Sequence, residues 1–225
     1  MAHGELWSAQ LFSAFLQASG SVEAATAYLD ARAVLAVEPD PHSDSPQVDW
    51  HTTKQSLDVW ISGLSGAATQ VETIVITGYI ARESASGATT TLKRKGSDYS
   101  ASIFGALFHA TEITLWTDFD GIKSADLDVV KGAYLLGELT YAELIEYSFH
   151  GSHSVVHPKT MVPALAAKIP IRIRNSFNLA CQGTLIHVGD NGVAHGTVGY
   201  DRIAWLGFYP FRMQPRTRLV PCDPL

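Results

Sequence analysis

In this 225-residue chain, the segment from Glu72 to Ile80 reads ETIVITGYI. It is a nearly continuous apolar run that closes on Gly78. Such runs are typical of a strand that is buried on both faces of a parallel sheet. Working outward from it, helical spacing of apolar residues predicts helices over 53–64 and 97–110.

Further along the chain, short apolar strands alternate with helices of about ten residues, which is the βαβ signature. The sequence therefore predicts an α/β fold: a three-layer αβα sandwich with a mainly parallel sheet. Thr73–Thr77, Glu112–Trp116 and Ile171–Arg174 should be neighbouring central strands. The remaining predicted helices are Thr140–Phe149 and Lys159–Lys168.

Composition narrows the class of protein. Apolar residues make up 46% of the chain and charged residues 17%, which excludes disorder of the highly charged kind. The net charge of −6 argues against nucleic acid as a partner. No apolar run is long enough to span a membrane, so no membrane partner is expected. Two cysteines, Cys181 and Cys222, make neither a disulfide framework nor a metal knuckle, and they suit a reducing compartment.

The most informative motif is TTTLKRKGSD, residues Thr89 to Asp98. Three cations precede Gly96-Ser97-Asp98, which opens a helix, and helix N-termini bind anions. Arg94 adds a planar fork suited to a carboxylate. The plainer alternative is a helix capped by Ser97 or Asp98 after a basic turn.

A second motif, WTDFDGI, covers Trp116 to Ile122 directly after a predicted strand. Ligands of open α/β sheets bind beyond the carboxyl ends of strands. A hydroxyl and a carboxylate at Thr117 and Asp118 could hold a nucleotide or its Mg²⁺ there. The alternative is a polar turn built on Asp120-Gly121.

Three histidines, His150, His153 and His157, have spacings of three and four. Gly151 and Pro158 make a continuous helix doubtful across them, so we predict no metal site. The sequence also contains no Walker-type phosphate loop and no nucleophile elbow.

Six motifs, from about Gly4 to Ile186, resemble motifs of aspartate kinase and occur in the same order as in that family. They most closely resemble the kinase half of the bifunctional aspartate kinase–homoserine dehydrogenases. They are HGELWS from His3, TGYI from Thr77, the segment from Thr89 to Tyr99, WTD and DG from Trp116, VVHPKT from Val155, and GTLI from Gly183. The resemblance implies a partial amino acid kinase domain over 1–186. Residues 187–225 form an unassigned tail.

Site roles follow from the resemblance alone. It implies that Glu5 receives the aspartate ammonium group. Arg94 holds a substrate carboxylate, and Ser97 and Asp98 complete that pocket beside Tyr79, with Arg94 and Asp98 as the catalytic residues. The resemblance also implies a nucleotide site at the three residues Thr117, Asp118 and Gly121, and ATP with Mg²⁺ as the cofactor.

Departures from the family pattern matter too. Aspartate kinases open with a strand that carries Lys-Phe-Gly-Gly-Thr-Ser, whereas here the first lysine is Lys54 and there is no Gly-Gly pair. The sheet is therefore expected to lack its first strands, and the chain to resemble a domain shortened at both ends. Asp128 stands where an ATP-facing cation is usual, and the stretch before His157 lacks the usual lysine. Activity is expected to be impaired for these reasons.

The leading interpretation is a kinase that uses ATP to phosphorylate the β-carboxylate of L-aspartate, the first step towards lysine, threonine and methionine. One alternative is a non-catalytic amino-acid-binding or partner subunit. Another is a related kinase that acts on glutamate or acetylglutamate, although the RKGSDY wording from Arg94 favours aspartate. The expected partners are L-aspartate and ATP, and a homo-oligomer is left open. The expected compartment is the cytoplasm, or the plastid stroma if a transit peptide has been lost.

Overall fold

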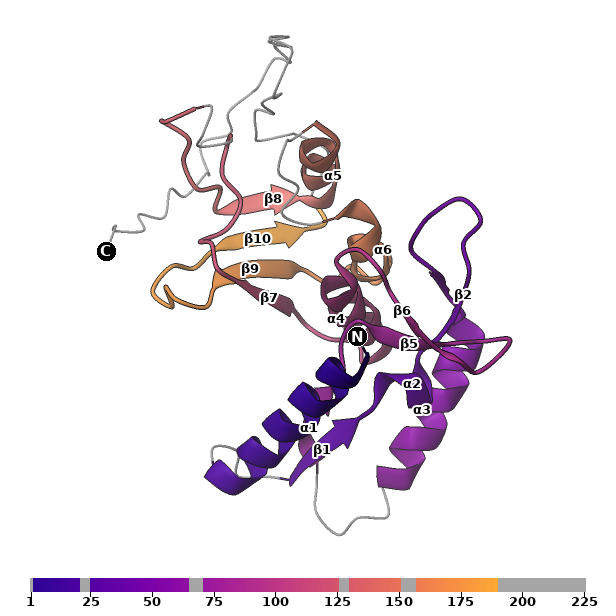
Figure 1. The fold of residues 1–225 in the computed structure, drawn as a ribbon. Coiled ribbons are helices and arrows are strands. Elements are labelled where there is room, and N and C mark those ends of the chain that lie inside the picture. The colour runs from indigo at the N-terminus through magenta and orange to yellow at the C-terminus, as the bar shows by residue number, and fades with distance from the viewer. Residues whose placement is uncertain (1, 21–24, 65–70, 126–129, 151–156, 190–225) are drawn as a thin grey trace. The chain divides into compact units, whose positions relative to one another are not determined.

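The computed structural model describes residues 2–20, 25–64, 71–125, 130–150 and 157–189, and the chain divides into two compact units at Ser100. Figure 1 shows the elements, and each unit is described by itself. The predicted fold class is confirmed as α/β, because parallel pairs outnumber antiparallel pairs among the described strands.

Unit 1 holds two small sheets and the helices that pack on them. Its elements are α1 (Ala2–Ser19), β1 (Ala25–Leu29), α2 (Ala31–Val34), β2 (Ala36–Glu38), β3 (Gln47–Val48), α3 (Trp50–Leu64), β4 (Val71–Ile76), β5 (Ile80–Glu83), β6 (Thr89–Thr91) and the start of α4 (Gly96–Leu107). β1 pairs with β4 in parallel, while the second sheet has the order β3-β2-β5-β6. Its core centres on the buried aliphatic residues of α2, β2 and β5.

Unit 2 is built on one sheet of order β7-β9-β10-β8. Its elements are β7 (Ile113–Thr117), β8 (Glu138–Thr140), α5 (Tyr141–His150), α6 (Pro158–Ala166), β9 (Ile171–Asn175) and β10 (Thr184–His187). Side chains of α5 and α6 form one core with those of β7, β9 and β10. Figure 1 shows both helices beside this sheet. Ala101 and Ala106 of α4 pack against this core.

Local chemistry explains where the helices of unit 2 begin. Before α5, Thr140 and Glu143 form a capping box: the Glu143 carboxylate accepts the Thr140 N–H at 2.6 Å, and the Thr140 hydroxyl accepts the Glu143 N–H at 3.2 Å. His157 caps α6 by accepting the Lys159 N–H, and Pro158 occupies the first turn.

One expectation about the sheet is wrong. β7 and β9 are parallel neighbours as predicted, but β4, which holds most of Thr73–Thr77, pairs with β1 in a separate two-stranded sheet. The side chains of β4 are also partly or fully exposed, not buried on both faces. An apolar run predicts that a strand forms, whereas its pairing partner depends on contacts that are distant in the sequence.

Cys181 is buried, and its Sγ lies 3.8 Å from the Asp120 carbonyl oxygen. Cys222 lies outside the described residues, as does nearly all of the 187–225 tail. The expected domain boundary at 186 therefore stays a prediction.

Candidate functional site

A cationic turn leads into α4 in unit 1. Leu92 is fully buried and anchors the turn, while Lys93, Arg94 and Lys95 are exposed. Lys93 and Lys95 have left-handed backbone angles, with φ of 63° and 54°. The helix begins at Gly96, so Ser97 and Asp98 lie in its first turn and do not act as the cap. Three positive side chains thus surround a helix end that itself favours anions.

Tyr79 is held against the start of this helix in a strained conformation. Its φ is 68°, which costs a non-glycine residue free energy. The Tyr79 N–H donates to Ser100 Oγ at 2.9 Å, and its carbonyl accepts the Leu92 N–H at 2.8 Å. A Cβ on Gly96 would lie only 2.6 Å from the Tyr79 ring, so position 96 must be glycine for the ring to rest there.

Ser100 is a site residue that sequence reasoning missed. It is almost fully buried, and its hydroxyl accepts from Tyr79 while donating to the Gly96 carbonyl at 3.0 Å. One hydroxyl therefore ties the turn after β4 to the first turn of α4. Strained residues persist where the surroundings fix them, and they often cluster at functional sites. Tyr79, Lys93 and Lys95 form such a cluster here.

Asp98 faces a partly desolvated environment in the same turn. Burial raises the pKa of the Asp98 carboxyl, and the positive charge of Lys95 opposes that shift. Within the described part of the chain, no hydrogen bond to this carboxylate is found. Ser97 is exposed, and its Cβ lies 3.8 Å from where a side chain on Gly78 would begin. The first turn of α4 therefore presents a carboxylate and a hydroxyl beside the cations.

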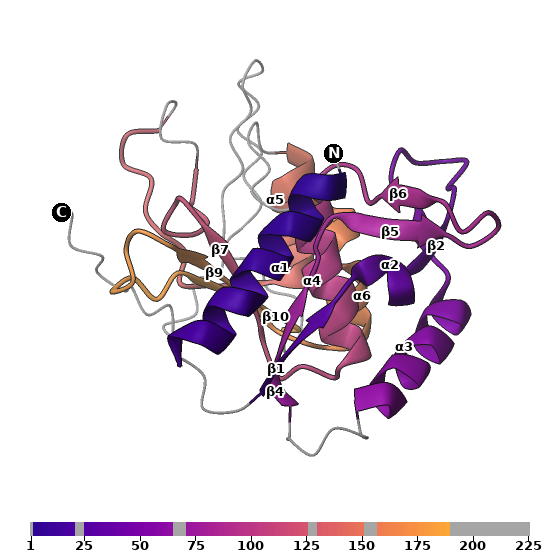
Figure 2. The ribbon, with the colours of Figure 1, turned by 60° about the horizontal axis from the view of Figure 1, so that its bottom comes forward.

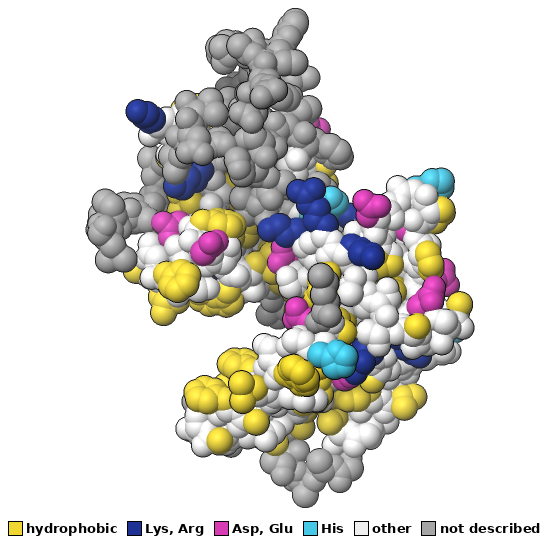
Figure 3. Space-filling view, in the orientation of Figure 1, with side chains coloured by type: hydrophobic (Ala, Val, Ile, Leu, Met, Phe, Trp, Pro, Cys, Tyr) yellow, Lys and Arg dark blue, Asp and Glu magenta, His cyan; other side chains and the backbone are white. Residues whose placement is uncertain are grey.

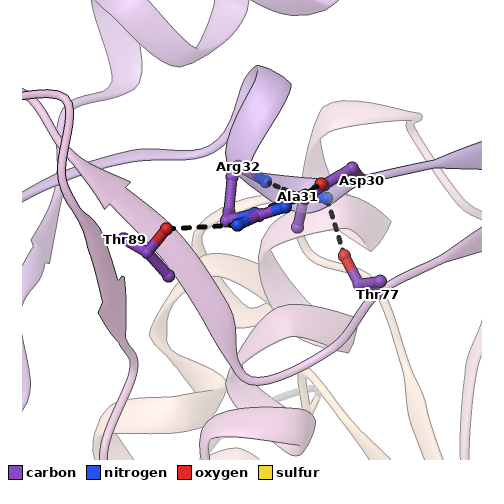
Figure 4. Close-up of polar contacts among 5 residues, drawn as sticks. All are labelled: Asp30, Ala31, Arg32, Thr77 and Thr89. Carbon is purple, nitrogen blue, oxygen red and sulfur yellow. Dashed lines mark hydrogen bonds and ion pairs between the residues drawn. The ribbon is translucent and has the colours of Figure 1, made fainter. Parts of the chain in front are cut away.

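A polar brace supports the segments on either side of this turn (Figure 4). Asp30 and Arg32 form an ion pair at 2.6 Å, and Arg32 also donates to the Thr89 hydroxyl at 3.2 Å, where β6 begins. The Ala31 N–H donates to the buried Thr77 hydroxyl at 2.7 Å, two residues before Tyr79. The start of α2 thus contacts both segments that lead to the cationic turn.

Glu5 lies in the first turn of α1 and is half-buried. In both ribbon views the N-terminal end of α1 lies near the start of β5 (Figures 1 and 2). That is where β6 finishes, because Ile80 of β5 pairs with Thr91 of β6. Among the described residues, no hydrogen bond or ion pair joins Glu5 to Arg94.

The predicted nucleotide residues lie in unit 2, at the carboxyl end of β7. The Thr117 hydroxyl donates to Asp118 Oδ1 at 3.2 Å, and the Asp118 side chain is exposed. Gly121 has a φ of 137°, and a Cβ there would lie 2.5 Å from the Thr184 hydroxyl. That buried hydroxyl accepts the Ile122 N–H at 2.9 Å, which fixes the loop. Glycine is therefore required at 121.

Some other residues that the sequence analysis singled out lie outside the residues that the structure describes. Asp128, His153 and the side chain of His150 are among them. In the described part, no cluster of three or more His, Cys, Asp or Glu side chains could hold a metal ion. Oxygen donors at Thr117 and Asp118 still suit Mg²⁺, which usually takes one or two carboxylates together with substrate phosphates. No helix in the described ranges has the length and apolar character needed to cross a membrane.

The chain belongs to the amino acid kinase family, whose profile matches residues 1–175. It is 43% identical over 186 residues to the bifunctional aspartokinase/homoserine dehydrogenase 1, chloroplastic, of Zea mays. That match covers 82% of this chain and 19% of the maize protein. It is 37% identical to the bifunctional aspartokinase/homoserine dehydrogenase 2 of Escherichia coli (strain K12), covering 78% of this chain and 20% of that protein.

Among solved structures, the fold resembles E. coli aspartokinase III in complex with aspartate and ADP, with a TM-score of 0.70 and 29% identity. This match covers 84% of the chain and 40% of the E. coli chain. The predicted resemblance to aspartate kinases is thereby confirmed. The chain spans about a fifth of the length of the curated relatives it matches.

Proposed function

We propose that this chain is the catalytic region of an aspartate kinase, which transfers the γ-phosphoryl group of ATP to the β-carboxylate of L-aspartate. The observation that carries the proposal is the cationic turn that leads into α4, with Tyr79 fixed against the start of this helix. The likeness to E. coli aspartokinase III, whose structure contains aspartate and ADP, supports the same substrates.

The amino-acid pocket is proposed to lie in unit 1. Arg94 offers two parallel N–H donors to a substrate carboxylate, and the free N–H groups of the first turn of α4 add to that attraction. Ser97 and Asp98 complete the pocket beside the Tyr79 ring, and Glu5 receives the ammonium group. A desolvated carboxylate such as Asp98 is stabilised in its charged form when a cationic group binds next to it.

The nucleotide is proposed to bind at Thr117, Asp118 and Gly121 in unit 2. Mg²⁺, held by Asp118 together with the phosphates, would neutralise charge on the transferred group. In the reaction a β-carboxylate oxygen bonds to the γ-phosphorus as the bond to the bridging oxygen breaks, so that 4-phospho-L-aspartate and ADP form. Catalysis of this kind depends on positioning and charge stabilisation, and it needs no covalent enzyme intermediate.

The test is an assay of ADP release with L-aspartate, run beside L-glutamate and N-acetylglutamate. Hydroxylamine in a parallel reaction converts an acyl phosphate into a stable hydroxamate, which separates transfer to aspartate from simple ATP hydrolysis. ADP release and hydroxamate that both require L-aspartate are expected. Product formed only with one of the other acceptors would assign the chain to a different amino acid kinase.

A second candidate function is a non-catalytic subunit that binds an amino acid or a fuller kinase chain. One observation favours it: all residues of the proposed amino-acid pocket belong to unit 1, whereas the proposed nucleotide residues belong to unit 2. Calorimetric binding of L-aspartate with no ADP release under any condition would select this function over the kinase.

Pathway and compartment follow from the proposed reaction and the relatives. The acyl phosphate product would feed the synthesis of lysine, threonine and methionine. The maize relative is described as chloroplastic, which favours the plastid stroma over the cytoplasm for this chain.

A further inference from the structure

The loop that joins β9 to β10 is tied to the loop that carries the proposed nucleotide residues. At the main chain, the Ser176 N–H donates to the Thr117 carbonyl at 2.8 Å. At the side chains, Asn175 and Asn178 both donate from Nδ2 to Asp120 Oδ1, at 2.8 Å and 3.1 Å. One carboxylate oxygen thus holds an amide from the end of β9 and a second amide from the loop that follows. We call Asp120, Asn175 and Asn178 the amide latch.

Hydrogen bonds do most to hold the tip of the β9–β10 loop in place. Its two large apolar side chains, Phe177 and Leu179, are 81% and 63% exposed. Hydrophobic and acidic side chains gather on the surface at the left of Figure 3, where Figure 1 draws this loop in orange. Because exposed apolar side chains contribute little free energy of burial, the position of the tip depends on polar contacts. The Asn175 amide is used at both ends, since its Oδ1 accepts the Phe177 N–H at 2.8 Å.

The loop after β7 is anchored on both sides of Asp118. Thr117 is held through its carbonyl, and at the far end the Ile122 N–H donates to the buried Thr184 hydroxyl at 2.9 Å. The amide latch holds Asp120 between these anchors, where this side chain is half-buried, while Asp118 is exposed. A loop that is ordered before its ligand arrives loses less conformational entropy on binding. The anchors therefore prepare Asp118 to meet a ligand.

The two carboxylates of this loop have different surroundings. Two like charges that both faced the phosphates of a nucleotide would repel them, whereas the latch turns the Asp120 carboxylate towards two amides. We infer that Asp120 acts through the amide latch as a positioning residue and not as a metal ligand. The latch sets the loop so that Thr117 and Asp118 meet the nucleotide phosphates and their Mg²⁺. This inference rests on the nucleotide site proposed above.

Calorimetric titration of the full chain with Mg·ADP separates a positioning role from a metal ligand. Asp120→Ala removes the acceptor of both amides, so the dissociation constant should rise about tenfold. Asp120→Asn keeps an oxygen acceptor but no charge, and it should bind Mg·ADP as the native chain does. Equal weakening in both variants would show that the charge of Asp120 is required, which overturns the inference.

Thr140→Ala is the matched control for lost stability. It removes one capping hydrogen bond, from the Glu143 N–H, on β8 at the opposite edge of the same sheet from β7. The dissociation constant of Mg·ADP should not change in this variant. In all variants, the affinity for L-aspartate without nucleotide should stay that of the native chain. An equal loss of Mg·ADP affinity in Thr140→Ala and Asp120→Ala would reduce the latch to a structural role.

Exchanging the partners of the latch tests its geometry. Asn175→Asp alone brings two carboxylates together and should weaken Mg·ADP binding. The double variant Asp120→Asn/Asn175→Asp should restore it, because the new amide at 120 can donate to the new carboxylate at 175. That carboxylate can also still accept the Phe177 N–H. A double variant that binds no better than Asn175→Asp would contradict the latch.

Amide hydrogen exchange follows the loop without any nucleotide. Exchange in residues 117–122 should be faster in Asn178→Ala and Asp120→Ala than in the native chain, and unchanged in Thr140→Ala. Unchanged exchange in the latch variants would refute the latch whether or not a nucleotide binds. A native chain that binds no Mg·ADP would overturn the proposed nucleotide site together with the role of the latch in it. Native binding that persists unchanged in every latch variant would overturn this inference alone.

Discussion

Arg94 is the side chain on which the proposed substrate site most depends. It is exposed in the cationic turn, and its guanidinium can meet a carboxylate with two parallel hydrogen bonds. We expect Arg94→Ala to weaken aspartate binding by about 2–3 kcal/mol, as measured by calorimetric titration. Arg94→Lys should also bind poorly, because an ammonium cannot reproduce the planar fork. Unchanged affinity in both variants would remove Arg94 from the site.

Ser100 acts through another residue, because its hydroxyl holds the strained Tyr79. Ser100→Ala leaves the Tyr79 N–H without its acceptor, which should lower the free energy of unfolding by about 1–3 kcal/mol and raise the KM for aspartate. The KM for ATP should stay the same.

Ser102 is the matched control on the same helix. It is equally buried, and its hydroxyl accepts the Ala164 N–H at 3.0 Å in unit 2. Ser102→Ala should cost similar stability without changing the KM for aspartate. If both serine variants change that KM equally, Ser100 has only a structural role.

The short helix α2 works as a unit with the strands around it. Its N-cap, Asp30, accepts the Arg32 N–H at 3.0 Å, and the ion pair between the two side chains lowers the pKa of the Asp30 carboxyl. The stability that this pair contributes is therefore fully present above about pH 4, the ordinary carboxyl value, and is lost as the pH falls through the lowered pKa.

Asp30→Asn tests this element, because asparagine keeps the cap but not the charge. We expect a loss of up to about 1 kcal/mol at pH 7, measured by urea unfolding, since the pair is partly exposed. The difference from the native chain should shrink below pH 4. A difference that is constant with pH would show that the charge of Asp30 does not contribute.

At the scale of the whole molecule, the two halves of the proposed site belong to different units. Asp118→Asn in unit 2 should therefore weaken ATP binding by roughly tenfold while aspartate binding in the absence of nucleotide stays the same. Arg94→Ala should have the reverse pattern. Separate calorimetric titrations of each ligand measure both. A variant of either residue that weakens both ligands equally would contradict the division of the site.

Much of this molecule could be predicted from local sequence alone. Helices and strands such as α4, α6, β7 and β9 follow from apolar spacing, and each was expected within a few residues of its place. The cationic turn before α4 and the polar residues after β7 were also found by motif. These features depend on residues that are close together in the sequence, so local patterns are enough to predict them.

Other features of the fold and of the proposed site could be seen only in the tertiary structure. β4 looked like a central strand, yet it pairs with β1, because an apolar run does not specify its partner. Ser100 carried no signal, since a serine within a helix shows its role only when the Tyr79 turn is seen to fold back onto it. Each of these depends on contacts between distant residues, and a local pattern cannot encode them.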